Sequence, residues 1–458
     1  MTPEPEPGRH DGAEHGGGQS RPLAGIRVVE LGIAMAGPLT ARYLGYFGAD
    51  VVRIESRRRP DSLRVSRPPW LPDGLSPDIA QDTWPLLNLS SADKRGIVLE
   101  IDREDGYRAF TQIVAAADVF VTNLSADAIP RLRISYDDIR AVQPDVIYLA
   151  TTAFGHDGPY RSFRTWGMNL CAISGLDAMV GWPDRDPTGI GMSFPDYPSA
   201  LLAVTAIVAA LQRRRRTGAG ARLDLPQFQM SINCIGPAVV DAALGRDAHA
   251  ARGNRAVNGD VQGVYPAAGE DRWVAITIDG EDAWRRLCSV DGLQALGTDP
   301  RLATAAGRAA ELDEIDEFLG AWTRRRSDWQ AAAELQEAGV AAAPVFDSWD
   351  VLGDQHLASR SYFQLAPSAR FGADLVTRPA AAPTGLTQQV RSAPPALGEH
   401  TREVLRDVAG LPPEEIDQLL ADGTAYQMPA PGTRLERPYL SWIGALLRLP
   451  WPGRRQAG

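Results

Sequence analysis

Residues 26–55, which read IRVVELGIAMAGPLTARYLGYFGADVVRIE, decide the fold. Residues 26–31 are short, apolar and rich in β-branched side chains, which is typical of a buried strand. A loop follows, and then a helix over residues 39–47 that Gly48 ends. Residues 50–55 repeat the strand pattern. The stretch is therefore predicted to be one βαβ unit with a right-handed crossover.

Further pairs of strands and helices follow this unit. Strands are predicted at residues 96–101, 119–123 and 146–151, with helical segments between them. Strands that alternate with helices predict a mostly parallel sheet covered on both faces. The fold class is therefore α/β, with a Rossmann-like large domain over residues 21–225. The loop after the first strand lacks the pattern Gly-x-Gly-x-x-Gly, which disfavours the alternative of a nicotinamide-dependent dehydrogenase.

The rest of the chain is divided into predicted segments by its residue composition and by its patterns of apolar and turn residues. A smaller α+β domain is predicted from turn-rich strands and an amphipathic helix. In order, we expect a disordered tail over residues 1–20, a linker over 226–250, the small domain over 251–345, a return linker and the C-terminal part of the large domain over 346–425, and a C-terminal extension over 426–458.

Composition excludes several classes of protein. The net charge of −10 argues against a general nucleic-acid binder, whose surface is basic. Lys94, the single lysine, is followed by Arg95, so the chain has no P-loop. The three cysteines form no metal-binding or disulfide motif. The apolar stretch at 200–211 is too short to span a membrane. We expect a cytoplasmic enzyme without a bound metal or a permanent cofactor.

Several sequence blocks, in a fixed order, carry a resemblance to a known family. They are PLAGIRVVELGIAMAGP from residue 22, ADKRGIVLEI from 92, PDVIYLATTAFGHDGPY from 144, PDYPSALLAV from 195 and PPALGEHTREVL from 394. The chain resembles the family III CoA-transferases, which also include α-methylacyl-CoA racemases. The resemblance implies that acyl-CoA and a carboxylic acid are the substrates. It also implies an interlocked homodimer, or alternatively a heteromer with a homologous subunit.

Asp196 stands directly before a long apolar helix. In similar enzymes this aspartate is the nucleophile, which forms an acyl anhydride and then an aspartyl-CoA thioester. A helix N-terminus favours a negative charge, so we expect the pKa of this carboxyl group to be lowered. The alternative is a plain helix N-cap, one of the commonest tasks of an aspartate.

The resemblance also implies where CoA lies, namely along the loop after the first strand and near the end of the second. The basic residues among these candidates have the alternative of forming a solvated basic stretch. The candidates are Ala36, Gly37 and Pro38 for the backbone approach, Arg53, Arg57, Lys94 and Arg95 for the phosphates, Asn123 at a strand end, and Asn258 and Gly259 in a loop that covers the site.

A racemase or epimerase of 2-methylacyl-CoA is the remaining alternative. Racemases of this group use a His-Asp pair to move the α-proton. The corresponding positions here are Trp166 and Gly167, and neither side chain can carry a proton at neutral pH. The sequence therefore favours a transferase.

Overall fold

The computed structural model of the 458-residue chain describes residues 21–66, 82, 86–246, 251–256, 258–381 and 389–429. The tail expected at 1–20 and the C-terminal extension from residue 430 onward lie outside the described residues. The chain divides into two structural units. The first contains the described residues up to Thr151, together with Ala200–Asp224 and the residues from Tyr362 onward, and the second contains Thr152–Ser199 and Leu225–Ser361.

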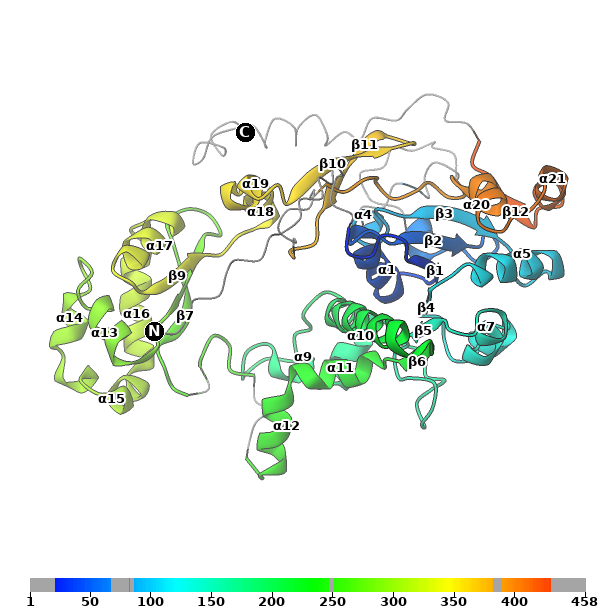
Figure 1. The fold of residues 1–458 in the computed structure, drawn as a ribbon. Coiled ribbons are helices and arrows are strands. Elements are labelled where there is room, and N and C mark those ends of the chain that lie inside the picture. Colours follow the sequence, from blue (N-terminus) through cyan, green and yellow to red (C-terminus); the bar gives the residue numbers. More distant parts are fainter. Residues whose placement is uncertain are drawn as a thin grey trace, which may run out of the picture. The chain divides into compact units, whose positions relative to one another are not determined.

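A seven-stranded sheet forms the centre of the first unit, in the order β12-β3-β2-β1-β4-β5-β6 (Figure 1). Its neighbouring strands are parallel, except that the short β12 pairs antiparallel with β3. The mostly parallel sheet expected from the sequence is thus confirmed. The strands are β1 (Arg27–Leu31), β2 (Asp50–Glu55), β3 (Arg95–Leu99), β4 (Val119–Thr122), β5 (Ile147–Ala150), β6 (Ala221–Asp224) and β12 (Ala425–Tyr426).

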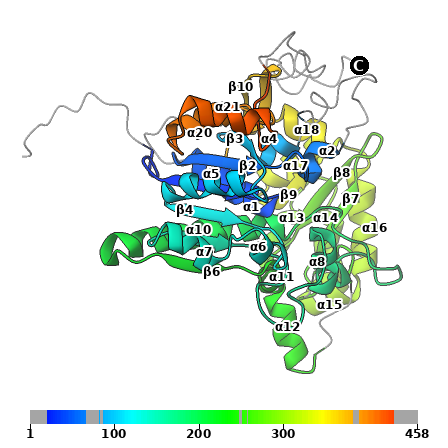
Figure 2. The same ribbon diagram turned by 90° about the vertical axis from the view of Figure 1, so that its right-hand side faces the viewer.

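Helices cover this sheet because its strands are apolar on both faces. Alternate strand residues, such as Val29, Val52 and Phe120, share one core with α5, α7, α20 and α21. Figure 2 shows α20 close to β3, and α20 also contacts α5. On the opposite face of the sheet, α1 packs against β1, β2 and β4. The helices of this unit are α1 (Ala36–Tyr46), α2 (Ser62–Val65), α4 (Leu86–Ser90), α5 (Glu104–Ala115), α6 (Ala128–Arg131), α7 (Tyr136–Val142), α20 (Thr401–Asp407) and α21 (Pro413–Ala421).

A separate hairpin also belongs to the first unit. Its strands, β10 (Phe363–Ser368) and β11 (Gly372–Thr377), pair antiparallel. The Asn88 side chain in α4 donates a hydrogen bond to the Leu375 carbonyl, at 2.8 Å. The return segment is thereby fastened to the large unit.

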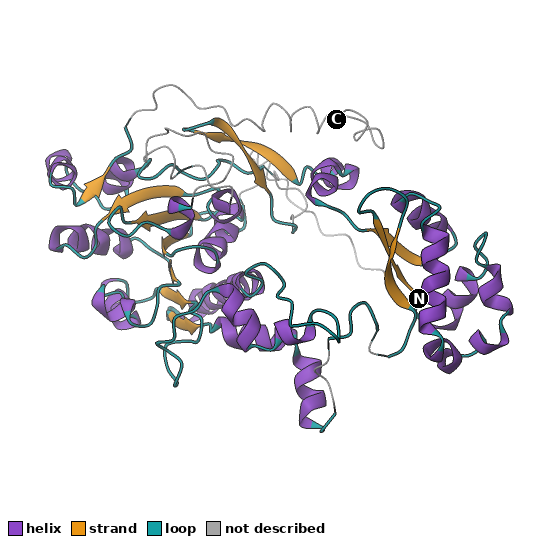
Figure 3. Cartoon of the chain, turned by 180° about the vertical axis from the view of Figure 1, so that it is seen from behind, coloured by secondary structure: helices purple, strands orange, loops and turns teal. Residues whose placement is uncertain are grey.

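The second unit contains a small antiparallel sheet packed against helices (Figure 3). Its strands are β7 (Gln262–Pro266), β8 (Trp273–Thr277) and β9 (Ala341–Pro344), in this spatial order. Helices α13 (Gly280–Leu287), α14 (Gln294–Thr298), α16 (Leu312–Thr323) and α17 (Asp328–Glu337) share one core with this sheet. The unit also contains α15 (Ala305–Ala310), α18 (Ser348–Gly353), α19 (Gln355–Ser359) and a 3-10 turn η1 (Pro300–Leu302). The expected small α+β domain is present.

Residues 226–250, which were expected to form a linker, contain two helices instead. These are α11 (Gln227–Cys234) and α12 (Gly236–Ala243). Pro237 lies in the first turn of α12, where its missing N–H has no helical partner to lose. Two shorter helices of the same unit, α8 (Gly167–Ile173) and α9 (Leu176–Met179), precede Asp196, and α8 contacts α11.

Helix α10 (Asp196–Thr217) is the longest helix in the described part of the chain. Arginines occupy its last turn, where cations interact favourably with the helix dipole. Gly218 follows with φ of 69°, and its N–H donates to the Arg214 carbonyl at 2.8 Å. A left-handed glycine whose N–H closes the last turn is a common end of a helix. No helix in the described residues is both long and apolar enough to cross a membrane.

Candidate active site

The carboxyl group of Asp196 lies at the start of α10. Its backbone N–H donates to the Ser193 carbonyl at 3.1 Å, so a turn leads directly into the helix. The side chain is half-buried, and Oδ1 accepts a hydrogen bond of 2.8 Å from Nε2 of Gln227. The Gln227 backbone is itself fixed, because its N–H donates to the Thr152 carbonyl at 2.9 Å. Two segments 31 residues apart in sequence therefore meet at this carboxylate.

The pKa of Asp196 differs from the sequence-based expectation. We expected the helix N-terminus to lower it, but burial raises the pKa to about 6, while the Gln227 hydrogen bond acts in the opposite direction. The expectation was wrong because the sequence shows the helix start and does not show how much water the fold removes. A group with this pKa is still roughly nine-tenths ionised at pH 7.

Asp196 has no cationic partner among the described residues. Within the part of the chain that the structure describes, it forms no ion pair, and Gln227 is neutral. Some buried carboxylates elsewhere in the described residues are paired with cations, as Glu55 is with Arg53 and Arg64. A desolvated carboxylate without a counter-ion is costly, and such groups concentrate at functional sites.

Of the two positions that correspond to the His-Asp pair of racemases, Gly167 has no room for a side chain. A Cβ atom added at Gly167 would lie 2.5 Å from Ser193 Cβ and 2.9 Å from its Cα. The Trp166 side chain is 62% exposed and its backbone N–H donates to Asn169 Oδ1 at 3.0 Å. An ionisable side chain at 167 would therefore force the backbone of Ser193 to move.

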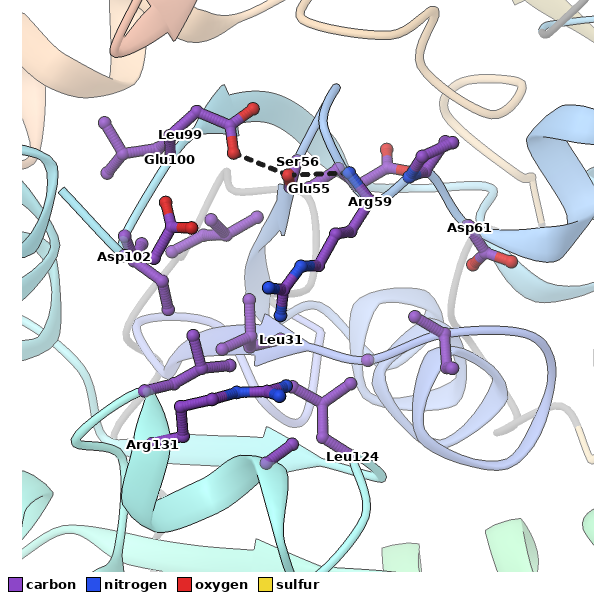
Figure 4. Close-up of a pocket in the computed structure, with 17 residues that line it drawn as sticks. Leu31, Glu55, Ser56, Arg59, Asp61, Leu99, Glu100, Asp102, Leu124 and Arg131 are labelled. Atoms are coloured by element: carbon purple, nitrogen blue, oxygen red, sulfur yellow. Dashed lines mark hydrogen bonds between the residues drawn. The ribbon is translucent and has the colours of Figure 1, made fainter. Parts of the chain in front are cut away.

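A cavity of about 270 Å³ lies in the first unit, at the carboxyl ends of β1, β2 and β3 (Figure 4). In parallel α/β sheets, this edge is where ligands bind. Apolar side chains form much of its wall, and Arg59 and Arg131 supply exposed positive charges at its rim. Figure 4 shows both arginine side chains reaching toward Leu31. The apolar residues are Leu31, Ile33, Ile54, Leu99, Ile101, Leu124 and Leu132.

The loop after β1 forms part of this cavity, through Gly32 and Ile33. Asn123 holds the loop with two hydrogen bonds of 2.8 Å, one from the Ile33 N–H to Oδ1 and one from Nδ2 to the Ile33 carbonyl. Asn123 also fills the space beside Gly32 and Gly37, where an added Cβ would lie 2.8 Å and 3.0 Å from its Oδ1. The glycines are therefore needed for close packing against Asn123.

The residues expected to offer their backbone to CoA are placed deeper than expected. Ala36, Gly37 and Pro38 are buried in the first turn of α1. The parts of the loop that reach the surface are Ile33 and Ala34.

The structure gives Arg53 and Lys94 a different environment from that of phosphate ligands. Arg53 is fully buried and donates to Asp61 Oδ2 at 2.6 Å and to Ser91 Oγ at 2.8 Å. Lys94 is also buried, and its ammonium donates to Glu30 Oε2 and to the Pro38 carbonyl, both at 2.7 Å. Burial lowers the pKa of Lys94 to about 8. Neither side chain is open to a ligand, because each charge is already occupied inside the protein.

Four other candidates are also placed. Arg95 is the first residue of β3, at the opposite edge of the sheet from the cavity, and pairs there with Asp50 at 2.5 Å. Arg57 is exposed and stacks on the Tyr426 ring at 4.0 Å. Asn258 donates from Nδ2 to Asp260 Oδ2 at 2.5 Å, and Gly259 has φ of 80°. None of the residues predicted to bind CoA lines the cavity itself. Asn123 lies beside it and holds Ile33, which is part of the cavity wall.

Sequence reasoning missed Gln227 and Arg131. Gln227 carried no signal, because its role depends on a contact between distant segments. Arg131 had only the weak signal of a basic residue that follows the strand end at Asn123. Groups of His, Cys, Asp and Glu that could hold a metal do not occur among the described residues.

The fold defines an α/β protein of Rossmann-like architecture with a ligand-sized cavity at the carboxyl edge of its sheet. The chain belongs to CoA-transferase family III, whose profile matches residues 23–401, and it is an enzyme that transfers CoA.

Relatives support this assignment. The chain is 31% identical to "Probable CoA-transferase Rv1866" of Mycobacterium tuberculosis over 87% of its own length, and it spans 50% of that protein. It is 28% identical to the succinyl-CoA–D-citramalate CoA-transferase of Chloroflexus aurantiacus, over 88% of this chain and 97% of the relative. A solved CAIB/BAIF family protein from Brucella suis has 26% identity and a TM-score of 0.76, and the match covers 85% of this chain and all of that one.

Proposed function

We propose that this chain moves CoA from an acyl-CoA donor to a carboxylic acid acceptor, with Asp196 as the covalent carrier. The observation that carries the proposal is a half-buried carboxylate at the start of α10 whose hydrogen-bond partner is the neutral Gln227. A raised pKa makes this carboxylate a better nucleophile than an ordinary aspartate, and it remains mostly ionised at pH 7.

The chemistry is balanced without an added acid or base. The Asp196 carboxylate attacks the thioester carbonyl, a C–O bond forms, and the C–S bond breaks to release CoA thiolate. The thiolate then attacks the aspartyl carbonyl of the anhydride, which releases the donor acid as a carboxylate and leaves an aspartyl-CoA thioester. The acceptor carboxylate repeats the first step on this thioester. The released thiolate finally attacks the acceptor's carbonyl and frees Asp196.

The direct experiment is mass spectrometry of the intact protein after incubation with a panel of acyl-CoA donors. A covalent intermediate adds the mass of CoA less one water, and a peptide map assigns it to Asp196. Rapid exchange of the α-proton for deuterium, without any transfer to acids, would instead favour the racemase. The steric conflict at Gly167 argues against that outcome.

The pH dependence of the first half-reaction follows from the raised pKa. Activity should increase as the pH rises through about 6 and level off above it, because the ionised form is the nucleophile. A Gln227→Leu variant loses the hydrogen bond that lowers this pKa, so its midpoint should move to higher pH. The phosphates of the CoA donor also titrate near pH 6. The informative quantity is therefore the difference in midpoint pH between variant and wild type, measured with the same donor.

Gln143→Leu is the matched control for this experiment. Gln143 donates to the Ala117 carbonyl at 3.0 Å, in the first unit, and does not contact Asp196. Its pH profile should coincide with that of the wild type. Identical midpoints for Gln227→Leu and Gln143→Leu would contradict the assignment of the profile to Asp196.

We further propose that the cavity in the first unit takes the nucleotide part of CoA. The apolar wall suits adenine, and Arg59 and Arg131 suit the phosphates. Each change to alanine should raise KM for acyl-CoA about tenfold, the cost of one charged hydrogen bond, and leave kcat nearly unchanged. Arg140→Ala, an exposed arginine in α7 away from the cavity lining, is the control. Unchanged KM in both cavity variants would remove this placement of CoA.

The homodimer implied by the family resemblance stays a prediction. Exposed apolar side chains on α8 and α12, such as Met168, Val239 and Val240, support an association surface in the second unit.

A further inference from the structure

The loop between β1 and α1 contains a strained residue. Ala34 has φ of 54°, a left-handed conformation that residues with a Cβ rarely adopt. The preceding residues, Gly32 and Ile33, line the cavity of the first unit. Strain in the backbone next to a ligand cavity persists only where the surrounding structure enforces it.

Asp61 supplies the contact that enforces it. The Ala34 N–H donates to both carboxylate oxygens of Asp61, at 2.9 Å and 3.1 Å. Oδ1 also accepts from the Leu63 N–H at 2.9 Å, so Asp61 caps α2 as well. Asp61 is 3% exposed and itself lines the cavity. One buried carboxylate thus joins the strained loop to the start of a helix.

Arg53 fixes this carboxylate from behind. Its Nη2 donates to Asp61 Oδ2 at 2.6 Å and to Glu55 Oε1 at 3.2 Å. Because Arg53 lies within β2, its buried ion pair with Asp61 fixes the position of the β1–α1 loop relative to the sheet. On the other side Asn123 holds both backbone groups of Ile33. Side chains from two different parts of the chain therefore hold two consecutive residues of the loop: Asn123 binds Ile33 and Asp61 binds Ala34.

We propose that Asp61 is a positioning residue for CoA, which holds Ala34 in the left-handed conformation and thereby shapes the wall of the cavity. The inference rests on the proposed placement of CoA in this cavity. Asp61→Asn keeps the size of the side chain and can still cap α2. It loses an acceptor, because its NH₂ group must face either Arg53 or the Ala34 N–H, which are both donors. The loop should then relax and the cavity wall should lose its shape.

The test measures binding and turnover separately. We expect Asp61→Asn to weaken CoA binding, as measured by calorimetry. The same variant should raise KM for acyl-CoA by about tenfold and keep kcat within about threefold of the wild-type value. Asp50→Asn is the matched control. Asp50 lies at the start of β2, the strand that carries Arg53, and pairs there with Arg27 and Arg95, away from the cavity. That variant should bind CoA normally.

A second variant separates positioning from a merely structural role. Glycine adopts positive φ without strain, so Ala34→Gly added to Asp61→Asn should restore at least threefold of the lost affinity. A failure of this rescue, or equal losses in Asp61→Asn and Asp50→Asn, would overturn the inference. Normal binding in Asp61→Asn together with weak binding in Arg131→Ala would overturn the inference and leave the CoA placement standing. Normal binding in both variants would overturn the CoA placement as well.

Discussion

Asp196→Asn and Asp196→Ala should lower CoA transfer by at least ~10³-fold, the scale expected when a covalent nucleophile is removed. Asparagine keeps the shape of the side chain and can keep a hydrogen bond with Gln227, so its loss of activity isolates the chemistry of the carboxylate. The measurement combines steady-state transfer with the mass spectrum of the protein after acyl-CoA is added. Wild type should carry a CoA adduct, and both variants should carry none.

The stability of the same variants is the control for this prediction. Because burial raises the pKa of Asp196 above its usual value, the ionised carboxylate opposes folding at neutral pH, and this penalty falls as the pH decreases through about 6. Asp196→Asn should therefore unfold at an equal or higher temperature than wild type at pH 7.5. Near-normal transfer by a folded Asp196→Ala protein, or a CoA adduct on another residue, would remove the proposed mechanism.

The sheet could be predicted from the sequence because its signals are local. Short β-branched runs, such as residues 26–31 and 50–55, alternate with helical segments, and the structure places strands at Arg27–Leu31 and Asp50–Glu55. The start of α10 at Asp196 was also predictable from the change to an apolar pattern. The helices in residues 226–250 were missed because each is only eight residues long and neither has a side-chain cap at its start.

The candidate site could be predicted only in part, because its electrostatics depend on tertiary contacts. Arg53 was taken as a phosphate ligand, although it lies between Val52 and Ile54 in a strand that is covered on both faces. A cation in the middle of such a strand must be paired inside the protein. Glu30 in the middle of β1 was the corresponding signal, and it was available in the sequence. The desolvation of Asp196 and its contact with Gln227 had no local signal.

Arg53→Met should destabilise the protein by about 3–5 kcal/mol, the cost of removing one partner from a buried ionic network. The change leaves Glu55 and Asp61 buried without this guanidinium. Although desolvation opposes it, the charge of Arg53, with that of Arg64, holds the pKa of Glu55 at about 2.

The pH dependence of this loss has a definite sign. In wild type, the stability that Glu55 contributes is present above its unfolded-state pKa and is lost as the pH falls through about 2. Without Arg53 the folded-state pKa of Glu55 rises, so protonation relieves the penalty in acid. Urea unfolding at pH 5 and pH 8 should therefore show a smaller difference from wild type at pH 5.

Arg58→Met is the control for Arg53→Met, because Arg58 is exposed and pairs with Asp102 at the surface. It should change the free energy of unfolding by less than about 1 kcal/mol, since surface ion pairs contribute little. A loss for Arg53→Met as small as that for Arg58→Met would mean that the surrounding carboxylates reach water or another cation. The same result would weaken the argument that Arg53 fixes Asp61, because a carboxylate that can rehydrate cannot hold Ala34 in a strained conformation.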